Sequence, residues 1–201
     1  TISDASGSYA FAYNSRDQLL TNSGPAGTLV FSYDIFGRLA SIASTRAGGA
    51  SVSYSYDSLN RISNAVDAVA GTATYGYDAV GNLKTARYPN SVTNTYTYDS
   101  LNRLTNLAAT TSSGTLATFA YKLAPAGNRT NLVDNIGGTS RTFNWGYDPL
   151  YRLTNEVITG ASPTGTLSYR YDSVGNRTNR MSSVSGIGNQ ALSYNTNDWL
   201  T

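Results

Sequence analysis

Aspartate is the residue type in this sequence whose recurrence could support catalysis or metal binding. Of the 12 acidic residues, Glu156 is the one glutamate, and six aspartates directly follow a tyrosine. Paired carboxylates could act as acid and nucleophile on a glycosidic bond, or they could ligate calcium. The six recurring carboxylates are Asp34, Asp57, Asp78, Asp99, Asp148 and Asp172.

The spacing of these aspartates argues against both chemistries. A glycosidase needs two carboxyl groups a few ångströms apart in unlike environments, whereas these occur singly in one recurring context. Calcium loops place several oxygen ligands in one short segment. The chain has neither His nor Cys, so imidazole bases, thiolates and the usual zinc ligands are missing. We therefore expect no catalytic residue, no metal, no cofactor and no enzyme activity, and we interpret Glu156 as a solvated surface residue.

The residues that follow each aspartate predict a tight turn. Asp at the first position of a type I turn accepts hydrogen bonds from the turn's own amides, and Gly or Asn tolerates the left-handed conformation three residues later. This pattern is typical of a three-residue hairpin loop closed by a G1 bulge. A bulky Tyr151 should be strained there. The left-handed position holds Gly37, Asn60, Gly81, Asn102, Tyr151 and Gly175.

The tyrosine before each turn marks an internal repeat. Nine copies are separated by 20 to 26 residues, and no segment remains for a second domain. We therefore predict a single array of about nine repeats over residues 1–201, uncapped at both ends. The copy at Tyr121 is degenerate, with Lys122 in place of Asp and two extra residues before Gly127. The anchors are Tyr13, Tyr33, Tyr56, Tyr77, Tyr98, Tyr121, Tyr147, Tyr171 and Tyr194.

The residues on either side of the turn predict two antiparallel strands. In eight of nine copies an aromatic residue stands two positions before the anchor, usually with a small residue between, as in a strand with unlike faces. The register should place Asp34 opposite Arg38 and Tyr33 opposite Leu39. An exposed pair of this kind contributes about 0.2–1 kcal/mol. The matching arginines of the other copies are Arg61, Arg103 and Arg152.

The composition agrees with strands and turns. Only 13% of residues are charged, and the 14 basic and 12 acidic residues are dispersed, so we expect neither nucleic-acid binding nor membrane insertion. Segments between copies, such as 110–114 and 160–165, are rich in Ser, Thr and Gly and are predicted loops at the opposite edge. The predicted fold class is all-β, a solenoid or spiral of antiparallel hairpins in a curved, tube-like or barrel-like sheet.

The motif as it stands in residues 54–62 and 75–83 resembles the YD repeat of bacterial RHS proteins, toxin-complex shells and teneurins. The resemblance covers essentially the whole chain. It implies a spiral of hairpins that in large members forms a hollow shell around a carried polypeptide, often a C-terminal toxin. It also implies secretion or a place at the cell surface, and for some members carbohydrate binding.

Three functional hypotheses follow from the sequence. The first is a structural array on the outside of a bacterium, as a wall, shell segment or head-to-tail filament that associates with further repeats or copies. The second is an adhesion module that stacks a glycan on rows of aromatic side chains. The third is a fragment of a shell that encapsulates a toxin. Cross-strand packing is the interpretation that we favour for the aromatic rows, since they share a face with Leu39 and its equivalents.

Overall fold

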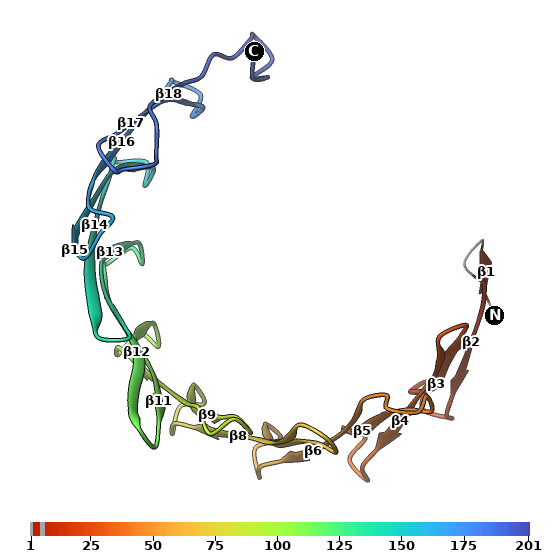
Figure 1. The fold of residues 1–201 in the computed structure, drawn as a ribbon. Helices are drawn as coiled ribbons and strands as arrows, with labels where there is room; N and C mark the ends of the chain where they lie inside the picture. Colours follow the sequence, from red (N-terminus) through yellow and green to blue (C-terminus); the bar gives the residue numbers. More distant parts are fainter. Residues whose placement is uncertain (1, 5–6) are drawn as a thin grey trace. The chain divides into compact units, whose positions relative to one another are not determined.

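The computed structural model describes residues 2–4 and 7–201 as strands joined by turns, without a helix (Figure 1). The all-β antiparallel prediction is therefore confirmed for this part of the chain. Residues 1–92 form an N-terminal unit and residues 93–201 a C-terminal unit, and each is described by itself. Among the described residues, no helix is available that could cross a membrane.

In the N-terminal unit each strand pairs in antiparallel fashion with the strand before and after it in sequence. This order is that of a hairpin array. Its strands are β1 (Ile2–Asp4), β2 (Gly7–Tyr13), β3 (Leu19–Gly24), β4 (Gly27–Tyr33), β5 (Leu39–Ser44), β6 (Ser51–Tyr56), β7 (Ile62–Asp67), β8 (Gly71–Tyr77) and β9 (Leu83–Arg87).

The C-terminal unit repeats the same order with longer strands. Each pairing again joins neighbours in the sequence. Its strands are β10 (Thr93–Tyr98), β11 (Leu104–Thr111), β12 (Gly114–Leu123), β13 (Arg129–Ile136), β14 (Thr139–Tyr147), β15 (Leu153–Gly160), β16 (Gly165–Tyr171), β17 (Arg177–Ser182) and β18 (Gln190–Ala191).

The predicted hairpin register is present. Tyr33 lies opposite Leu39, and the amide of Asp34 donates to the carbonyl of Arg38 at 2.9 Å. The next pair is Ser32 with Ser41, so Ala40 is an extra residue that forms a β-bulge. The same shift follows the turn in the pairs β2–β3, β6–β7, β8–β9, β10–β11, β12–β13, β14–β15 and β16–β17.

The two faces of the strands differ as the alternation predicts. On β6, Ser51, Ser53 and Ser55 are exposed, whereas Tyr54 and Tyr56 are half-buried. We call the side that carries the motif tyrosines the aromatic face. The other side carries small hydroxyl residues, and Ser32 and Ser41 hydrogen-bond across it at 2.7 Å.

Little apolar volume is fully enclosed. The one cluster of buried hydrophobic side chains among the described residues is Ile158, Leu167 and Val184, with Phe143 and Tyr169 packed against it. A layer of strands without a second layer cannot bury its side chains on all sides. Stability must therefore rely strongly on hydrogen bonds within and between hairpins.

One prediction about loops needs correction. The strands extend further into segment 110–114 than expected, because Thr111 pairs with Gly114 and leaves a two-residue turn. The sequence interpretation also passed over a further turn, directly after β9. Ser91 adopts a φ of 67°, and its amide donates to the carbonyl of Tyr88 at 3.0 Å, as in the turns after the anchors.

The copy assigned to Tyr121 was anchored two residues too early. Leu123 lies opposite Arg129, as Tyr33 lies opposite Leu39, and Ala124 closes the turn in the place of Asp. Tyr121 therefore occupies the aromatic position two residues before the anchor. The two apparent extra residues disappear, since a leucine has replaced the anchor tyrosine while the turn kept its length.

Tyr151 occupies the left-handed position that its bulk disfavours. Its φ is 59°, its side chain is 64% exposed, and its amide donates to the carbonyl of Asp148 at 2.9 Å. The turn geometry is therefore that of the Gly and Asn copies. An exposed side chain offers little packing energy to offset the steric cost of this conformation, which is about 1–2 kcal/mol.

Replacement of Tyr151 by Gly should therefore stabilise the protein. We expect a gain of about 1 kcal/mol, seen as a rise of about 2–4 °C in the thermal midpoint measured by circular dichroism. Leu150→Gly is the matched control, because its position has no positive φ and the change should not stabilise. An unchanged or lower midpoint for Tyr151→Gly would contradict the assigned strain.

Candidate functional site

Each motif aspartate is bound within its own turn. One carboxylate oxygen of Asp57, Oδ1, accepts the amides of Leu59 and Arg61, both at 2.9 Å, and Oδ2 accepts Nε of Arg61 at 2.7 Å. Asp34, Asp99 and Asp148 repeat these three bonds with their own turns. Both carboxylate oxygens are therefore engaged in closing the hairpin.

Two copies lack the arginine but keep the arrangement. In the turns that begin at Asp78 and Asp172, Asn82 and Asn176 donate through Nδ2 to Oδ2 of the aspartate, each at 3.0 Å. The first copy has Asn14 in the place of Asp, and its Oδ1 still accepts the amides of Arg16 and Gln18. These copies therefore share a side-chain oxygen, Oδ1, that accepts the turn amides, whereas the charges of the carboxylate and of the arginine are not common to all of them.

These bonds stabilise the ionised carboxylates. The amide of Arg61 is the largest influence on Asp57 and lowers the pKa of its carboxyl below the ordinary 3.8, against a smaller opposing effect of desolvation. The amide of Arg103 lowers the pKa of Asp99 in the same way. For the remaining four, desolvation raises the pKa but the combined hydrogen bonds outweigh it, so that the pKa is again lowered: Asp34, Asp78, Asp148 and Asp172.

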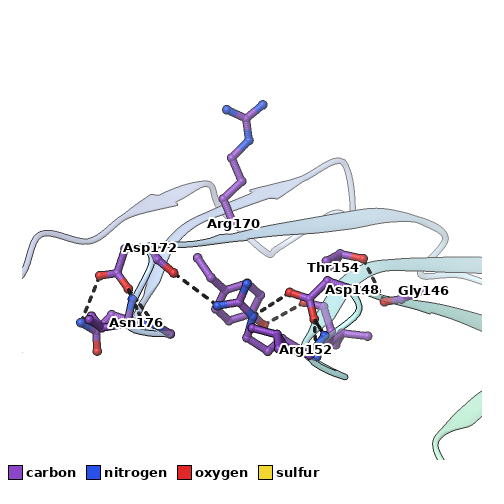
Figure 2. A network of polar contacts seen from close by, with 12 residues as sticks. Gly146, Asp148, Arg152, Thr154, Arg170, Asp172 and Asn176 are labelled. Carbon is purple, nitrogen blue, oxygen red and sulfur yellow. Dashed lines mark hydrogen bonds and ion pairs between the residues drawn. The ribbon is translucent and has the colours of Figure 1, made fainter.

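In three copies the arginine that pairs with the aspartate also hydrogen-bonds to the next turn. Arg38 donates from Nη1 to Oδ1 of Asn60 at 2.6 Å, and its guanidinium carbon lies 4.4 Å from the ring centroid of Tyr56. In Figure 2, Arg152 lies between its partner Asp148 and the backbone carbonyl of Asp172, which it meets at 3.3 Å. One side chain therefore joins two successive hairpins.

The hydroxyl group of the anchor tyrosine makes a second link. Tyr56 donates to the carbonyl of Leu39 in the preceding hairpin at 2.8 Å. Because the acceptor is a backbone oxygen, the bond does not depend on which side chain that hairpin carries. The same bond joins Tyr33 to Leu19, Tyr77 to Ile62, Tyr147 to Arg129, Tyr171 to Leu153 and Tyr194 to Arg177.

The sequence interpretation missed a threonine at the bulge. Thr154 is the extra residue of the β14–β15 hairpin, and its hydroxyl donates to the carbonyl of Gly146 across the hairpin at 3.1 Å (Figure 2). Thr105, Thr130 and Thr178 do the same in their own hairpins. The recurrence of Thr directly after the Leu or Arg that faces the anchor was the signal that could have revealed it.

Arg170 confirms that the two faces carry different groups. It follows the aromatic residue Tyr169, in a position that is small in most copies and large also at Lys122, between Tyr121 and Leu123. In Figure 2 its side chain extends away from the network around Asp148 and Asp172. The network therefore lies at the turns, and this charge does not join it.

Glu156 is not the solvated surface residue that we expected. It is half-buried on the aromatic face, paired across strands with Trp145 on one side and Leu167 on the other. Together with desolvation, which is the larger effect, its charge raises the pKa of Tyr147 and Tyr169. The reason is the β-bulge at Thr154. The extra residue shifts the alternation of side chains between the two faces by one position, so that Glu156 lies on the aromatic face.

A buried ion pair was also missed. Asp134 is 3% exposed and accepts Nη2 of Arg141 at 2.6 Å from the neighbouring strand. The hydrogen bond that Arg141 donates to Asp134 raises the pKa of the guanidinium. Asp134 also accepts the Arg141 amide at 3.1 Å, so this pair fastens β13 to β14.

The described residues bring no carboxylates together as a catalytic or metal-binding group would require. In the part of the chain that the structure covers, no cluster of three His, Cys, Asp or Glu side chains stands ready for a metal ion. The recurring carboxylates instead occupy one turn each along the edge. We call the edge that these turns form in each unit its turn edge; the turns begin at Asp34, Asp57 and Asp78 in the N-terminal unit and at Asp99, Asp148 and Asp172 in the C-terminal unit.

A shallow groove lies on the aromatic face of the N-terminal unit. It has a volume of about 300 Å³ and runs between two hairpins. Tyr77, on its wall, uses its hydroxyl to bind the carbonyl of Ile62. The groove is lined by Tyr54, Ile62, Ala65, Tyr75, Tyr77 and Leu83.

The repeated network of aspartate, arginine and tyrosine agrees with a comparison to known families. The profile of the Teneurin YD-shell family matches residues 1–200. The chain belongs to this family. The resemblance noted in the sequence is thereby confirmed, whereas no curated protein matches the sequence.

Solved structures of the same fold come from the TcdB2–TccC3 proteins. The crystal structure of TcdB2-TccC3-TEV superimposes with a TM-score of 0.79 at 17% identity over 95% of this chain. That of TcdB2-TccC3 gives 0.75 at 17% identity over 98%. This YD-shell chain spans 12% and 15% of the length of those two chains. At such identity the likeness shows the fold.

The tyrosine link can be tested by removing one oxygen. Tyr56→Phe should destabilise the protein by about 1 kcal/mol, because the carbonyl of Leu39 loses its partner. Tyr54→Phe is the matched control, since the structure gives its hydroxyl no hydrogen bond and the ring lies on the same face. Urea unfolding followed by circular dichroism measures both, and equal losses would contradict the link.

The lowered carboxyl pKa values predict acid sensitivity. A group whose pKa falls on folding stabilises the folded state above its unfolded value of 3.8, and this contribution is lost as the pH falls through the folded pKa. The variant Asp57→Asn/Asp99→Asn should be less stable than wild type at pH 7 and should lose less stability between pH 5 and pH 2. Asn14 and Asn195 show that Asn keeps the turn.

Thermal midpoints at pH 7, 5, 3 and 2 measure this effect. Asp17→Asn serves as the control, because it removes a carboxylate from an exposed turn position that is not a motif aspartate. A double variant with the same pH profile as wild type would show that the turn carboxylates do not cause the acid sensitivity.

Proposed function

We propose that this chain is a stretch of a YD-shell wall, a structural array on the outside of a bacterial cell without catalysis. The observation that carries the proposal is the use of the carboxylates. In the motif turns both oxygens of each aspartate are engaged by the turn's own amides and by the Arg or Asn beside it. A carboxylate held in this way contributes to hairpin closure and is poorly available as a base or nucleophile.

The links between hairpins support the same role. Arginines of the motif and six of the anchor tyrosines join one hairpin to the next, as in Arg38 to Asn60 and Tyr56 to Leu39. Such links are repeated between neighbouring hairpins along the array and do not gather at one place. This repetition favours a structural wall over an enzyme, in which the functional groups would gather at one place.

Association with further repeats or copies is part of the proposal. The chain spans 12–15% of the TcdB2–TccC3 chains that share its fold, so a wall built from it requires more hairpins than it supplies. The function has two possible forms. The further hairpins belong either to one long polypeptide or to other copies that add head to tail in a filament. Enclosure of a cargo polypeptide, as in toxin-complex shells, would be the closed form of this wall.

The adhesion hypothesis has one structural feature in its favour, the tyrosine groove. A pyranose ring could stack on Tyr54 or Tyr75, but sugar recognition also needs converging polar groups. The groove is lined by three Tyr and three aliphatic residues, and the hydroxyl of Tyr77 is already bound to Ile62. We therefore favour the wall over the glycan site.

A glycan array tests the two hypotheses against each other. We expect the purified chain to give no signal above background, and Tyr75→Ala to behave as wild type does. Reproducible binding to one glycan class that is lost in Tyr75→Ala would replace the wall proposal with an adhesion module. Thr74→Ala, on the opposite face of the same strand, is the control for unspecific effects of substitution.

Assays of turnover test the absence of catalysis. We expect no hydrolysis of chromogenic glycosides, esters or peptides by the wild-type chain. Turnover that disappears in Asp148→Asn, a variant that should retain the turn, would overturn the structural assignment of the motif carboxylates.

A further inference from the structure

Large apolar side chains project from the turn edge into solvent. The second residue after the aspartate is Phe36, Leu59 and Val80 in three successive turns of the N-terminal unit. Their exposed fractions are 74%, 67% and 71%. Leu101, Leu150 and Val174 occupy the same position in the C-terminal unit and are exposed to a similar degree.

The three tips of the N-terminal unit belong to turns that are in contact. Arg38 of the first turn donates to Asn60 of the second at 2.6 Å. A Cβ atom on Gly81 of the third turn would lie 3.7 Å from Nη1 of Arg61 in the second. Phe36, Leu59 and Val80 therefore form a continuous row, here called the tip row.

Turn formation does not require these apolar residues. The position lies at the loop apex, and the first copy forms the same turn with Arg16 there. Single exposed apolar residues are ordinary on protein surfaces, but a row that recurs at the same position of successive repeats marks an interaction surface.

The period of the tip row identifies the partner. One tip occurs per hairpin, that is about every 10 Å, since neighbouring strands lie about 4.8 Å apart. A surface that engages each tip needs the same period, and a second copy of this edge has it. Asp34 and Asp57 are neutralised within their turns by Arg38 and Arg61 at 2.7 Å. Asp78 pairs with the neutral Asn82 and keeps its charge, so the pairing must not place Asp78 opposite Asp78 of the other copy.

We propose that a second copy of this chain docks on the tip row, turn edge against turn edge, with two-fold symmetry. In such an isologous contact Leu59, the middle tip, meets Leu59 of the other copy, and Phe36 meets Val80. The inference rests on the proposed wall function and adds a lateral contact, distinct from head-to-tail addition of hairpins.

The size of the row sets the expected strength. Three tips that each expose on the order of 100 Å² bury roughly 600 Å² in a symmetric pair, below the roughly 1,200 Å² of a stable interface. Pairing of isolated chains is therefore reversible and rises with concentration. Many copies side by side in a wall would add these contacts together.

The absence of cysteine makes a cross-linking test possible. Leu59→Cys should form disulfide-linked dimers about ten-fold faster than Val69→Cys under the same mild oxidant, measured on non-reducing gels. Val69 lies at the opposite edge and is 91% exposed, so random collision would favour the control. Equal rates, or faster dimerisation of Val69→Cys, would overturn the proposal.

A second variant tests whether fast cross-linking comes from docking of the tip rows or only from the exposure of the thiol at position 59. Adding Phe36→Ser and Val80→Ser to Leu59→Cys should return cross-linking to the rate of Val69→Cys. The fold should be retained, as seen in an unchanged circular dichroism spectrum, although Phe36→Ser removes a ring that lies 5.1 Å from the Arg38 guanidinium. Persistent fast cross-linking in this triple variant would show that the tip row does not make the contact. Such a failure would leave the wall proposal intact, because that rests on the bonds within the array.

Discussion

A sheet that pairs each strand only with its neighbours in sequence must be held together from within. In both units the described residues enclose few side chains, so the hydrophobic effect cannot fasten distant parts of the chain to one another. The bond from the anchor tyrosine to the backbone of the preceding hairpin meets this constraint. It spans two hairpins, and the aromatic ring that carries it covers part of the sheet.

The arginine and the aspartate of the motif are connected to the anchor tyrosine of the next hairpin. Arg61 is fixed on one side by Asp57 and lies 4.2 Å from the ring centroid of Tyr77 on the other. The hydroxyl of Tyr77 in turn binds Ile62, the residue that follows Arg61. Hairpin closure and hairpin joining are therefore parts of one network, and the loss of one member weakens the position of the others.

The sequence was sufficient to predict the elements that local chemistry determines. Asp, Gly and Asn at fixed offsets from Tyr predict the turn, and the aromatic alternation predicts the strands and the register of Tyr33 with Leu39. The links between hairpins were not predictable, since the acceptor of the tyrosine hydroxyl is a backbone carbonyl and leaves no pattern of residue types. Glu156 was misplaced for a related reason, because a bulge in the strand reverses the face on which a residue lies.

The degenerate copy shows where a motif search misleads. An alignment that seeks tyrosine selects Tyr121, whereas the register of the strands selects Leu123. The hairpin tolerates the exchange since the turn amides at Ala124 still close the loop, with Gly127 in the left-handed conformation. Backbone geometry is thus more persistent in this array than the residues that favour it.

The tyrosine bond ends on a carbonyl whose own side chain is free to vary. Leu39, Ile62 and Leu153 offer that oxygen, and so do Arg129 and Arg177, which place a charge where the others place a hydrocarbon. The bond that joins two hairpins is consequently independent of the side chain that the accepting residue carries. Substitutions at these positions can therefore change the surface of one hairpin from apolar to charged while the hydrogen bond between hairpins is kept.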